Sequence, residues 1–340
     1  MDCIAKGREA DELMNGRDEE KKMLTVIYGD ATLGVKGAVD GKAFHYIFSY
    51  STGGLESLVT EGKEWLYRTP RPTFWRALTD NDRGNRFHLK SGMWLSADMF
   101  LPCIKTEVAI DGKEIIFPCA PQNNKCSDNE KATSVRITFT YETITVPSTT
   151  VKVSYEVNAE GVMKVTACYH GKEGLPSLPV FGMRFIMPTC ADKFVYSGLS
   201  GETYPDRKAG GISGVYEVEG LPVTPYLVPQ ECGMHMDTDW VEIYRTSESD
   251  NRKKEKKQTG LRVEANQELF AFSCLPYTAQ ELENATHQEE LPPARRTVLC
   301  ICGKVRGVGG IDSWGADVEE AYRIDATKDI TFSFVINPRV

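Results

Sequence analysis

The sequence predicts an all-β protein whose antiparallel sheets pack face to face as one large sandwich. Apolar and polar residues alternate with period two in several runs, which is the pattern of a strand with one buried face. Clusters of Gly, Pro, Asn and Asp separate these runs at short intervals, as turns between antiparallel strands require. Repeated alternation of strands with helices is missing, so neither a TIM barrel nor a Rossmann domain is predicted.

Length and charge set limits on what the chain can do. Its 340 residues are enough for one large all-β domain with a sizeable core. The net charge of −8 argues against nucleic acid or an anionic membrane as the main partner, because both attract concentrated Lys and Arg. No run approaches the roughly 18 apolar residues of a membrane span. Ten scattered cysteines without a CxxC pair, and no signal-peptide pattern, predict a cytoplasmic protein with reduced thiols and no zinc site.

The chain divides into a short lead-in and one long folded part. Residues 1–22 are highly charged and show no consistent period, so we expect either a frayed helix or a disordered segment there. Residues 23–340 carry the strand signals and are expected to form the sandwich. A second charged run at residues 248–257 is interpreted as a solvated hairpin loop.

The clearest elements are four strands and one helix. Residues 158–161 (Asn-Ala-Glu-Gly) form a turn that predicts a β-hairpin between two of the strands. Thr278 and Glu281 form a capping box, which predicts a short helix through Leu282 and Ala285, the one convincing helix in the sequence. The four alternating strand runs are residues 135–141, 151–157, 162–169 and 330–336.

The densest polar cluster, Thr-Asp-Asn-Asp-Arg-Gly at residues 79–84, has two readings. Its acidic residues suggest a calcium loop, but the twelfth position counted from Asp80 is Ser91, where an EF-hand needs a bidentate Glu. We therefore interpret the cluster as an Asx-rich turn whose side chains bind their own backbone. The segment from Gly84 to Gly92 reads as a flexible loop.

Three further stretches are polar or rich in glycine. The loop at 201–207 carries Asp206 next to Arg207. We interpret these two residues either as a buried ion pair that holds the loop or as part of a functional site. His235 has no partner at metal-ligand spacing, so a structural role is favoured over that of a base or ligand. No helix follows the glycines at 307, 309 and 310 as a phosphate site requires, so they are expected to let the backbone bend before Trp314.

Trp314 stands alone among small and acidic residues. Ser313 and Gly315 flank it, and Asp312 and Asp317 lie close by. An indole in such company is either a lid over something buried or a flat apolar surface offered to a ligand. No alternating pattern runs through it, so we expect it at the surface. Composition and pattern alone name no reaction.

Four motifs in a fixed order resemble a known family. They are Phe-Trp-Arg-Ala with Thr-Asp-Asn-Asp at 74–82, Gly-Glu-Thr-Tyr-Pro-Asp-Arg at 201–207, Pro-Tyr-Leu-Val-Pro-Gln-Glu at 225–231 and Gly-Ile-Asp-Ser-Trp at 310–314. Together they resemble the C-terminal sandwich domain of family 2 β-galactosidases, most closely the separately encoded small subunit of the heterodimeric lactobacillus type. The resemblance covers essentially residues 23–338.

The resemblance implies a fold, a partner and two site residues. The fold is a large antiparallel supersandwich similar to galactose mutarotases. The catalytic glutamates and the magnesium ligands of the family lie in a TIM barrel, so this chain is expected to hold no catalytic residue and no metal. It would complete the sugar pocket of a large subunit that hydrolyses β-galactosides such as lactose. The residue matching Trp314 forms an aromatic wall of that pocket, and the segment from Gly84 resembles a loop that shifts when substrate binds.

Two departures and two alternatives accompany this reading. Cys232 stands where the family usually has Asn, and the segment after Gly84 is short and basic, so their roles do not transfer directly. The chain could instead be a free-standing carbohydrate-binding or mutarotase-like module, which would need an acid/base pair such as His235 or His170 with a Glu. A third reading is that these residues are part of a longer single-chain enzyme.

Overall fold

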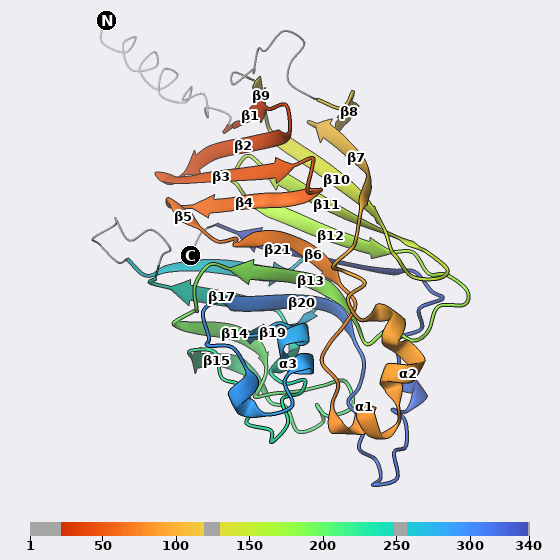
Figure 1. Cartoon of the computed structure of the whole chain (residues 1–340). Coiled ribbons are helices and arrows are strands. Elements are labelled where there is room, and N and C mark those ends of the chain that lie inside the picture. The colour runs from red at the N-terminus through yellow and green to blue at the C-terminus, as the bar shows by residue number, and fades with distance from the viewer. Residues whose placement is uncertain (1–21, 119–129, 248–256, 339–340) are drawn as a thin grey trace, which may run out of the picture.

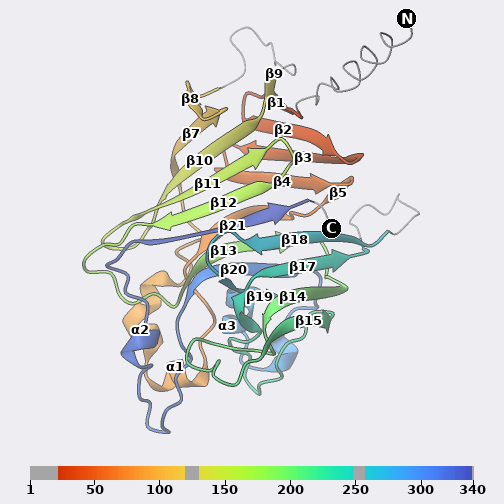
Figure 2. The same ribbon diagram turned by 180° about the vertical axis from the view of Figure 1, so that it is seen from behind.

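Antiparallel strands dominate the computed structural model of the chain, which describes residues 22–118, 130–247 and 257–338. The strands form three sheets in two layers. One long sheet runs the length of the molecule and forms the first layer (Figure 2). Two shorter sheets lie one above the other and cover one face of the long sheet (Figure 1). The predicted all-β antiparallel class is confirmed.

The two layers of the sandwich are made by segments distant in sequence. One short sheet has the order β5 (Lys63–Glu64), β4 (Gly54–Thr60), β3 (Lys42–Ser49), β2 (Thr32–Val39), β1 (Leu24–Tyr28), β9 (Glu130–Ala132). The other has the order β16 (Met234–Thr238), β19 (Phe270–Leu275), β20 (Thr297–Val305), β13 (Val180–Met187), β6 (Arg68–Thr73). The long sheet has the order β15 (Ser213–Glu219), β14 (Lys193–Leu199), β17 (Trp240–Arg245), β18 (Thr259–Ala265), β21 (Ile330–Asn337), β12 (Met163–Tyr169), β11 (Thr150–Asn158), β10 (Ser134–Glu142), β7 (Cys103–Ile110), β8 (Lys113–Ile115).

The four predicted strands are confirmed as parts of β10, β11, β12 and β21. Side chains of β11 alternate between buried and more exposed along the strand, as its sequence period requires. The predicted hairpin joins β11 to β12, with Val157 opposite Met163 and with Gly161 in the left-handed region at φ +73°. β21, the C-terminal strand, lies between β12 and β18 and joins the two halves of the long sheet.

Aromatic side chains fill the space between the layers. Phe48 of β3 and Tyr155 of β11 have ring centroids 5.5 Å apart, which joins the first short sheet to the long one. Phe181 of β13 lies 5.5 Å from Phe332 of β21 and joins the second short sheet to the same long sheet. The rings of Phe48, Tyr155 and Phe181 belong to one continuous buried cluster, and partly buried Phe332 packs against it, so the core spans both halves of the sandwich.

The prediction of a single convincing helix is wrong. The capping box at Thr278 is confirmed and starts α3 (Ala279–Asn284). However, residues 79–84 form a second capped helix, α1 (Asp80–Gly84), rather than an Asx-rich turn. The segment read as a loop from Gly84 contains α2 (Phe87–Ser91) and η1 (Gly92–Trp94). Both α1 and α2 have only five residues, too short for a helical period to show in the sequence.

Other predictions fall partly outside the described residues. The charged lead-in and the charged run at 248–257 lie there apart from Lys22 and Lys257, as do Cys3, Cys119 and Cys126. The seven cysteines of the described ranges have free thiols. Among the helices that the structure describes, none is long and apolar enough to cross a membrane.

Candidate functional site

The candidate site lies at one end of the molecule, where α1 meets the long connection between β20 and β21 (Figure 1). The chain reaches α1 directly from β6, through a buried segment anchored by aromatic packing. Phe74 stacks between Trp94 and Phe181, and Trp75 lies over Phe87 of α2. The core of the sandwich therefore fixes the position of α1.

A capping box closes the N-terminus of α1. The Thr79 hydroxyl accepts a hydrogen bond from the backbone N–H of Asp82 at 3.1 Å, and the Asp82 carboxylate accepts one from the backbone N–H of Thr79 at 3.0 Å. The side chain of Gln230 adds a third contact by accepting from the N–H of Asp80 at 2.8 Å. These bonds satisfy N–H groups that a helix start leaves without intrahelical partners.

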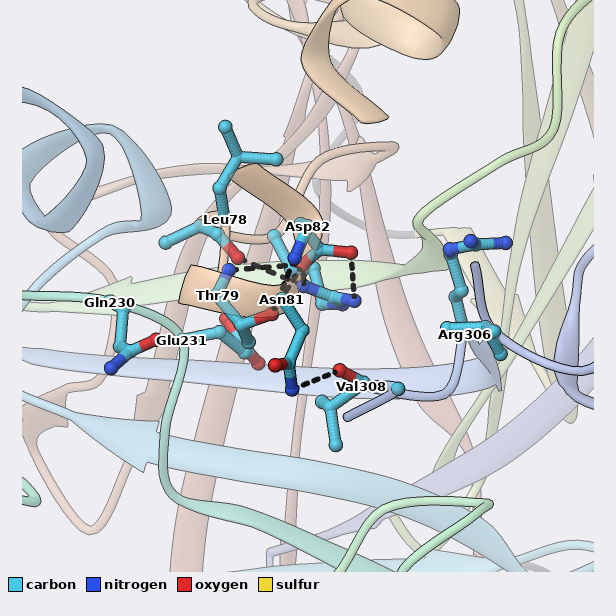
Figure 3. A network of polar contacts seen from close by, with 12 residues as sticks. Leu78, Thr79, Asn81, Asp82, Gln230, Glu231, Arg306 and Val308 are labelled. Carbon is cyan, nitrogen blue, oxygen red and sulfur yellow. Dashed lines mark hydrogen bonds and ion pairs between the residues drawn. The ribbon is translucent and has the colours of Figure 1, made fainter. Parts of the chain in front are cut away.

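A buried ion pair joins α1 to the β20–β21 connection. Arg76 donates to Asp82 at 2.6 Å, and both side chains are almost completely buried. The same guanidinium donates to the carbonyl of Gly307 at 3.0 Å. Asn81 continues this contact by donating to the carbonyl of Val308 at 3.0 Å (Figure 3).

The opposite side of residues 308–309 is held by the loop between β14 and β15. The Asp206 carboxylate accepts from the backbone N–H groups of Val308 at 2.9 Å and Gly309 at 2.8 Å. Arg207 donates to the carbonyl of Gly309. Asp206 and Arg207 thus bind the backbone of a distant segment, which differs from the ion pair that their adjacency in sequence suggests.

A second buried arginine, at the start of the same connection, holds its middle. Arg306 forms an ion pair with Asp317, and its guanidinium lies 4.3 Å from the centre of the Phe87 ring of α2. Lys90, also on α2, contacts Asp317 at 3.5 Å. Residues 310–316 therefore form a loop between two fixed points, 308–309 and Asp317.

Trp314 lies at the surface of this loop, as its neighbours predict. Trp314 is 92% exposed, so it covers nothing in the part of the chain that the structure describes, and the interpretation as a lid is not supported. The Asp312 carboxylate accepts from the N–H groups of Trp314 at 2.9 Å and Ala316 at 3.1 Å, which holds the loop in a compact turn. Gly315 has φ +85°, a conformation that disfavours other residues.

The segments that carry the two predicted site residues, Gly84 and Trp314, lie close together. A Cβ added to Gly315 would meet the carbonyl oxygen of Gly84 at 2.8 Å, so glycine is required at 315 by both backbone angle and close approach. At Gly84 a Cβ would have only an ordinary contact of 3.8 Å. The two segments enclose a hollow of about 120 Å³ lined by Asp80, Asn81, Gly84, Gly310, Asp312, Ser313, Gly315 and Ala316.

Glu231 is a buried carboxyl beneath α1 that the sequence did not single out. It is 7% exposed, and Tyr204 donates to it at 3.5 Å. Burial raises the pKa of Glu231 to about 7, although the positive charge of Arg76 acts in the opposite direction. Its neighbour Cys232 is buried against Ala77 and Leu282 and serves as a small apolar residue. This packing explains how a cysteine fits at a position where the family usually has Asn.

The two histidines do not form an acid/base site together. His235 is packed among aromatic rings, 4.8 Å from Phe272 and 4.5 Å from Tyr196 between ring centroids. Burial lowers the pKa of His235 to about 4, which supports the structural role favoured from the sequence. His170 lies 3.8 Å from Asp329 after β12, on another part of the sandwich. Within the described ranges, no three His, Cys, Asp or Glu side chains gather closely enough to hold a metal ion.

The four sequence motifs thus converge on one corner, and comparison with known proteins tests their family. Residues 40–336 match the β-galactosidase small chain family. The chain belongs to this family. It is 64% identical over 316 residues to a β-galactosidase small subunit of Latilactobacillus sakei, covering 93% of this chain and 98% of that protein.

Longer members of the family match over a fraction of their length. A β-galactosidase of Halalkalibacterium halodurans is 33% identical over 92% of this chain, which spans 28% of that protein. A β-galactosidase of Streptococcus thermophilus is 30% identical over 98% of this chain, which spans 30% of it. Among solved structures, a putative aldose 1-epimerase of Escherichia coli K12 covers 93% of this chain and 98% of its own at 11% identity and a TM-score of 0.40.

The raised pKa of Glu231 predicts how the stability of the folded chain depends on pH. The pKa of Glu231 is about 7 in the folded chain and 4.5 in an ordinary glutamate. Between pH 4.5 and pH 7 the Glu231 carboxyl is therefore protonated in the folded state and ionised in the unfolded state. The free energy of unfolding should therefore fall as pH rises through about 7. Relative to Glu231→Gln, the fall between pH 5 and pH 8.5 should be roughly 3 kcal/mol, measured by urea unfolding. An identical pH dependence in wild type and variant would contradict it.

Proposed function

We propose that this chain is one half of a β-galactosidase, completing the sugar pocket of a large subunit that hydrolyses terminal β-galactosides such as lactose. The observation that carries the proposal is the exposed Trp314 indole, held by an ordered loop beside a polar hollow. The family supports it, and so do relatives of about three times this length that are named β-galactosidases and match this chain over only 28–30% of their residues.

In this proposal Trp314 binds the apolar face of the sugar. Pyranose rings present C–H groups on one face, and an indole offers a flat surface of matching character. Polar groups around the hollow, from Asn81, Asp312 and Ser313, are placed to contact hydroxyl groups at the sugar edge. Gly84 lies at the same hollow, so the segment from Gly84 is assigned to substrate binding and to the shift that accompanies it.

The hydrolytic step is assigned to the partner. Glycoside hydrolysis generally uses two carboxylates at a defined separation, one of which must hold a proton. At the hollow, Asp312 is occupied by two backbone N–H groups and Asp80 is 72% exposed and paired with Arg83. We therefore assign no catalytic residue or metal to this chain, and place the catalytic glutamates and magnesium on the large subunit.

The segments around the site also carry exposed apolar side chains suited to a partner. Ile311 precedes Trp314 in the loop and is 56% exposed, while Leu227, in the segment that leads to Gln230, is 88% exposed. Leu89 on α2 is 72% exposed. Burial of such side chains by a large subunit would give an interface of the obligate kind, on the order of 2,000 Å² or more.

The proposal predicts that activity requires both chains. Purified alone, this chain should not hydrolyse a chromogenic β-galactoside, because it lacks the proposed catalytic carboxylates. Addition of the large subunit should restore turnover, with a stoichiometric complex detected by analytical ultracentrifugation. Hydrolysis by the isolated chain, once host enzyme is excluded by a deletion strain, would contradict the half-site.

Substitution of Trp314 tests the sugar contact. In the assembled enzyme, Trp314→Ala should raise KM for a galactoside by about tenfold, which corresponds to about 1.4 kcal/mol and lies near the upper end of what an aromatic packing contact contributes. Trp314→Tyr should recover much of the loss, and Trp240→Ala, at a partly exposed tryptophan on β17, should leave KM unchanged. If Trp314→Ala instead lowers the melting temperature and leaves KM at its wild-type value, Trp314 has a structural role.

A further inference from the structure

We propose that Asp206 and its neighbour Arg207 are positioning residues that hold the Trp314 loop in its sugar-binding orientation. This inference rests on the function proposed above. Neither residue lines the hollow beside Trp314. Both act through the backbone at 308–309, where the loop begins.

The geometry of Asp206 is that of an anchor for the backbone. Each carboxylate oxygen accepts one hydrogen bond, from the consecutive N–H groups of Val308 and Gly309 at 2.9 and 2.8 Å. Hydrogen bonds from N–H groups to a carboxylate are stronger than those between neutral groups. Arg207, from the same β14–β15 loop, donates to the carbonyl of Gly309, so both backbone polar groups of Gly309 are bound.

The backbone at this point needs such an anchor. Gly309 and Gly310 both have positive φ, at +71° and +79°, and neither has a side chain that could pack into the core. Glycine loses more conformational freedom on ordering than any other residue, so an unsupported Gly-Val-Gly-Gly segment would let the loop move. The side chains of Asp206, Arg207 and Asn81 supply the contacts that the glycines cannot.

The glycines in turn make room for the anchor. A Cβ added to Gly307 would approach the Asp206 carboxyl carbon to 2.7 Å, and one added to Gly310 would approach the Asn81 side-chain nitrogen to 2.7 Å. The glycine-rich stretch is therefore shaped for close approach of polar side chains on both sides. This is a more specific reason for these glycines than a sharp bend before Trp314.

The consequence for the site follows from the two ends of the loop. Asp317 fixes its C-terminal end through Arg306, while Asp206, Arg207, Asn81 and Arg76 fix its N-terminal end. With one end released, the indole would sample many orientations, and binding of a sugar would have to restore one of them. That cost appears as weaker substrate binding.

The test combines the mobility of Trp314 in the isolated chain with kinetics of the assembled enzyme. The other four tryptophans, Trp65, Trp75, Trp94 and Trp240, are common to the wild type and Trp314→Phe, so subtraction of the Trp314→Phe signal isolates the fluorescence of Trp314. Asp206→Ala should add a fast nanosecond component to the Trp314 anisotropy decay and raise KM three- to tenfold. Arg207→Ala, an exposed position, should act in the same direction. Asp237→Ala, which removes a carboxylate of β16 that pairs with Lys208 of the same loop at 2.7 Å, should change neither.

A double variant separates this inference from the proposed function. In the Trp314→Ala background, Asp206→Ala should raise KM by clearly less than in the wild type, because most of its effect passes through the indole. Unchanged anisotropy in Asp206→Ala and Arg207→Ala, or a rise in KM of equal size in both backgrounds, would overturn the positioning role. If anisotropy changes while Trp314→Ala itself leaves KM unaltered, the anchor of the loop is supported but its role in sugar binding is overturned together with the proposed sugar contact.

Discussion

The arrangement of the site depends on the buried ion pair between Arg76 and Asp82. The Arg76 guanidinium contacts the cap of α1 and the carbonyl of Gly307 at once, so two segments more than 200 residues apart share one charged group. Burial of an ion pair contributes little net stability, but loss of one partner leaves an uncompensated charge and costs about 3–5 kcal/mol. This asymmetry fixes the relative position of α1 and the Trp314 loop.

Around this ion pair, the sandwich holds the exposed Trp314 on a loop that is fixed at both ends. The core aromatics hold the segment before α1, α1 holds the start of the loop, and Arg306 with Asp317 holds its end. A tryptophan that is 92% exposed favours aggregation unless a ligand or partner covers it, yet here several polar contacts hold the loop that carries Trp314. Such an arrangement is suited to a surface that another chain turns into a pocket.

The sequence predicts the strands and the exposure of Trp314 but not the pairing of the strands or the buried charges. Period two shows which face of β11 or β21 is buried, but not that β21 pairs with β18, because partner choice is settled by contacts between distant segments. α1 is signalled only by Thr79 and Asp82 at capping-box spacing, a pattern that fits a turn equally well. The sequence does not indicate that Arg76 is buried, because a charged side chain is rarely buried without a partner and only the fold reveals that Asp82 is this partner. The adjacency of Asp206 and Arg207 suggests an ion pair, whereas both side chains bind residues about 100 positions further along the chain.

In the proposed complex, Trp314 contacts the sugar in a pocket shared with a second chain. The most direct measurement is ¹⁹F NMR of 5-fluorotryptophan-labelled protein, with the Trp314 resonance assigned by Trp314→Phe. We expect this resonance to shift on addition of the large subunit and to shift again on addition of a slowly hydrolysed galactoside, while the resonances of buried Trp65 and Trp94 stay in place. A Trp314 resonance that stays at its free-chain position in a complex that hydrolyses galactosides would contradict the claim.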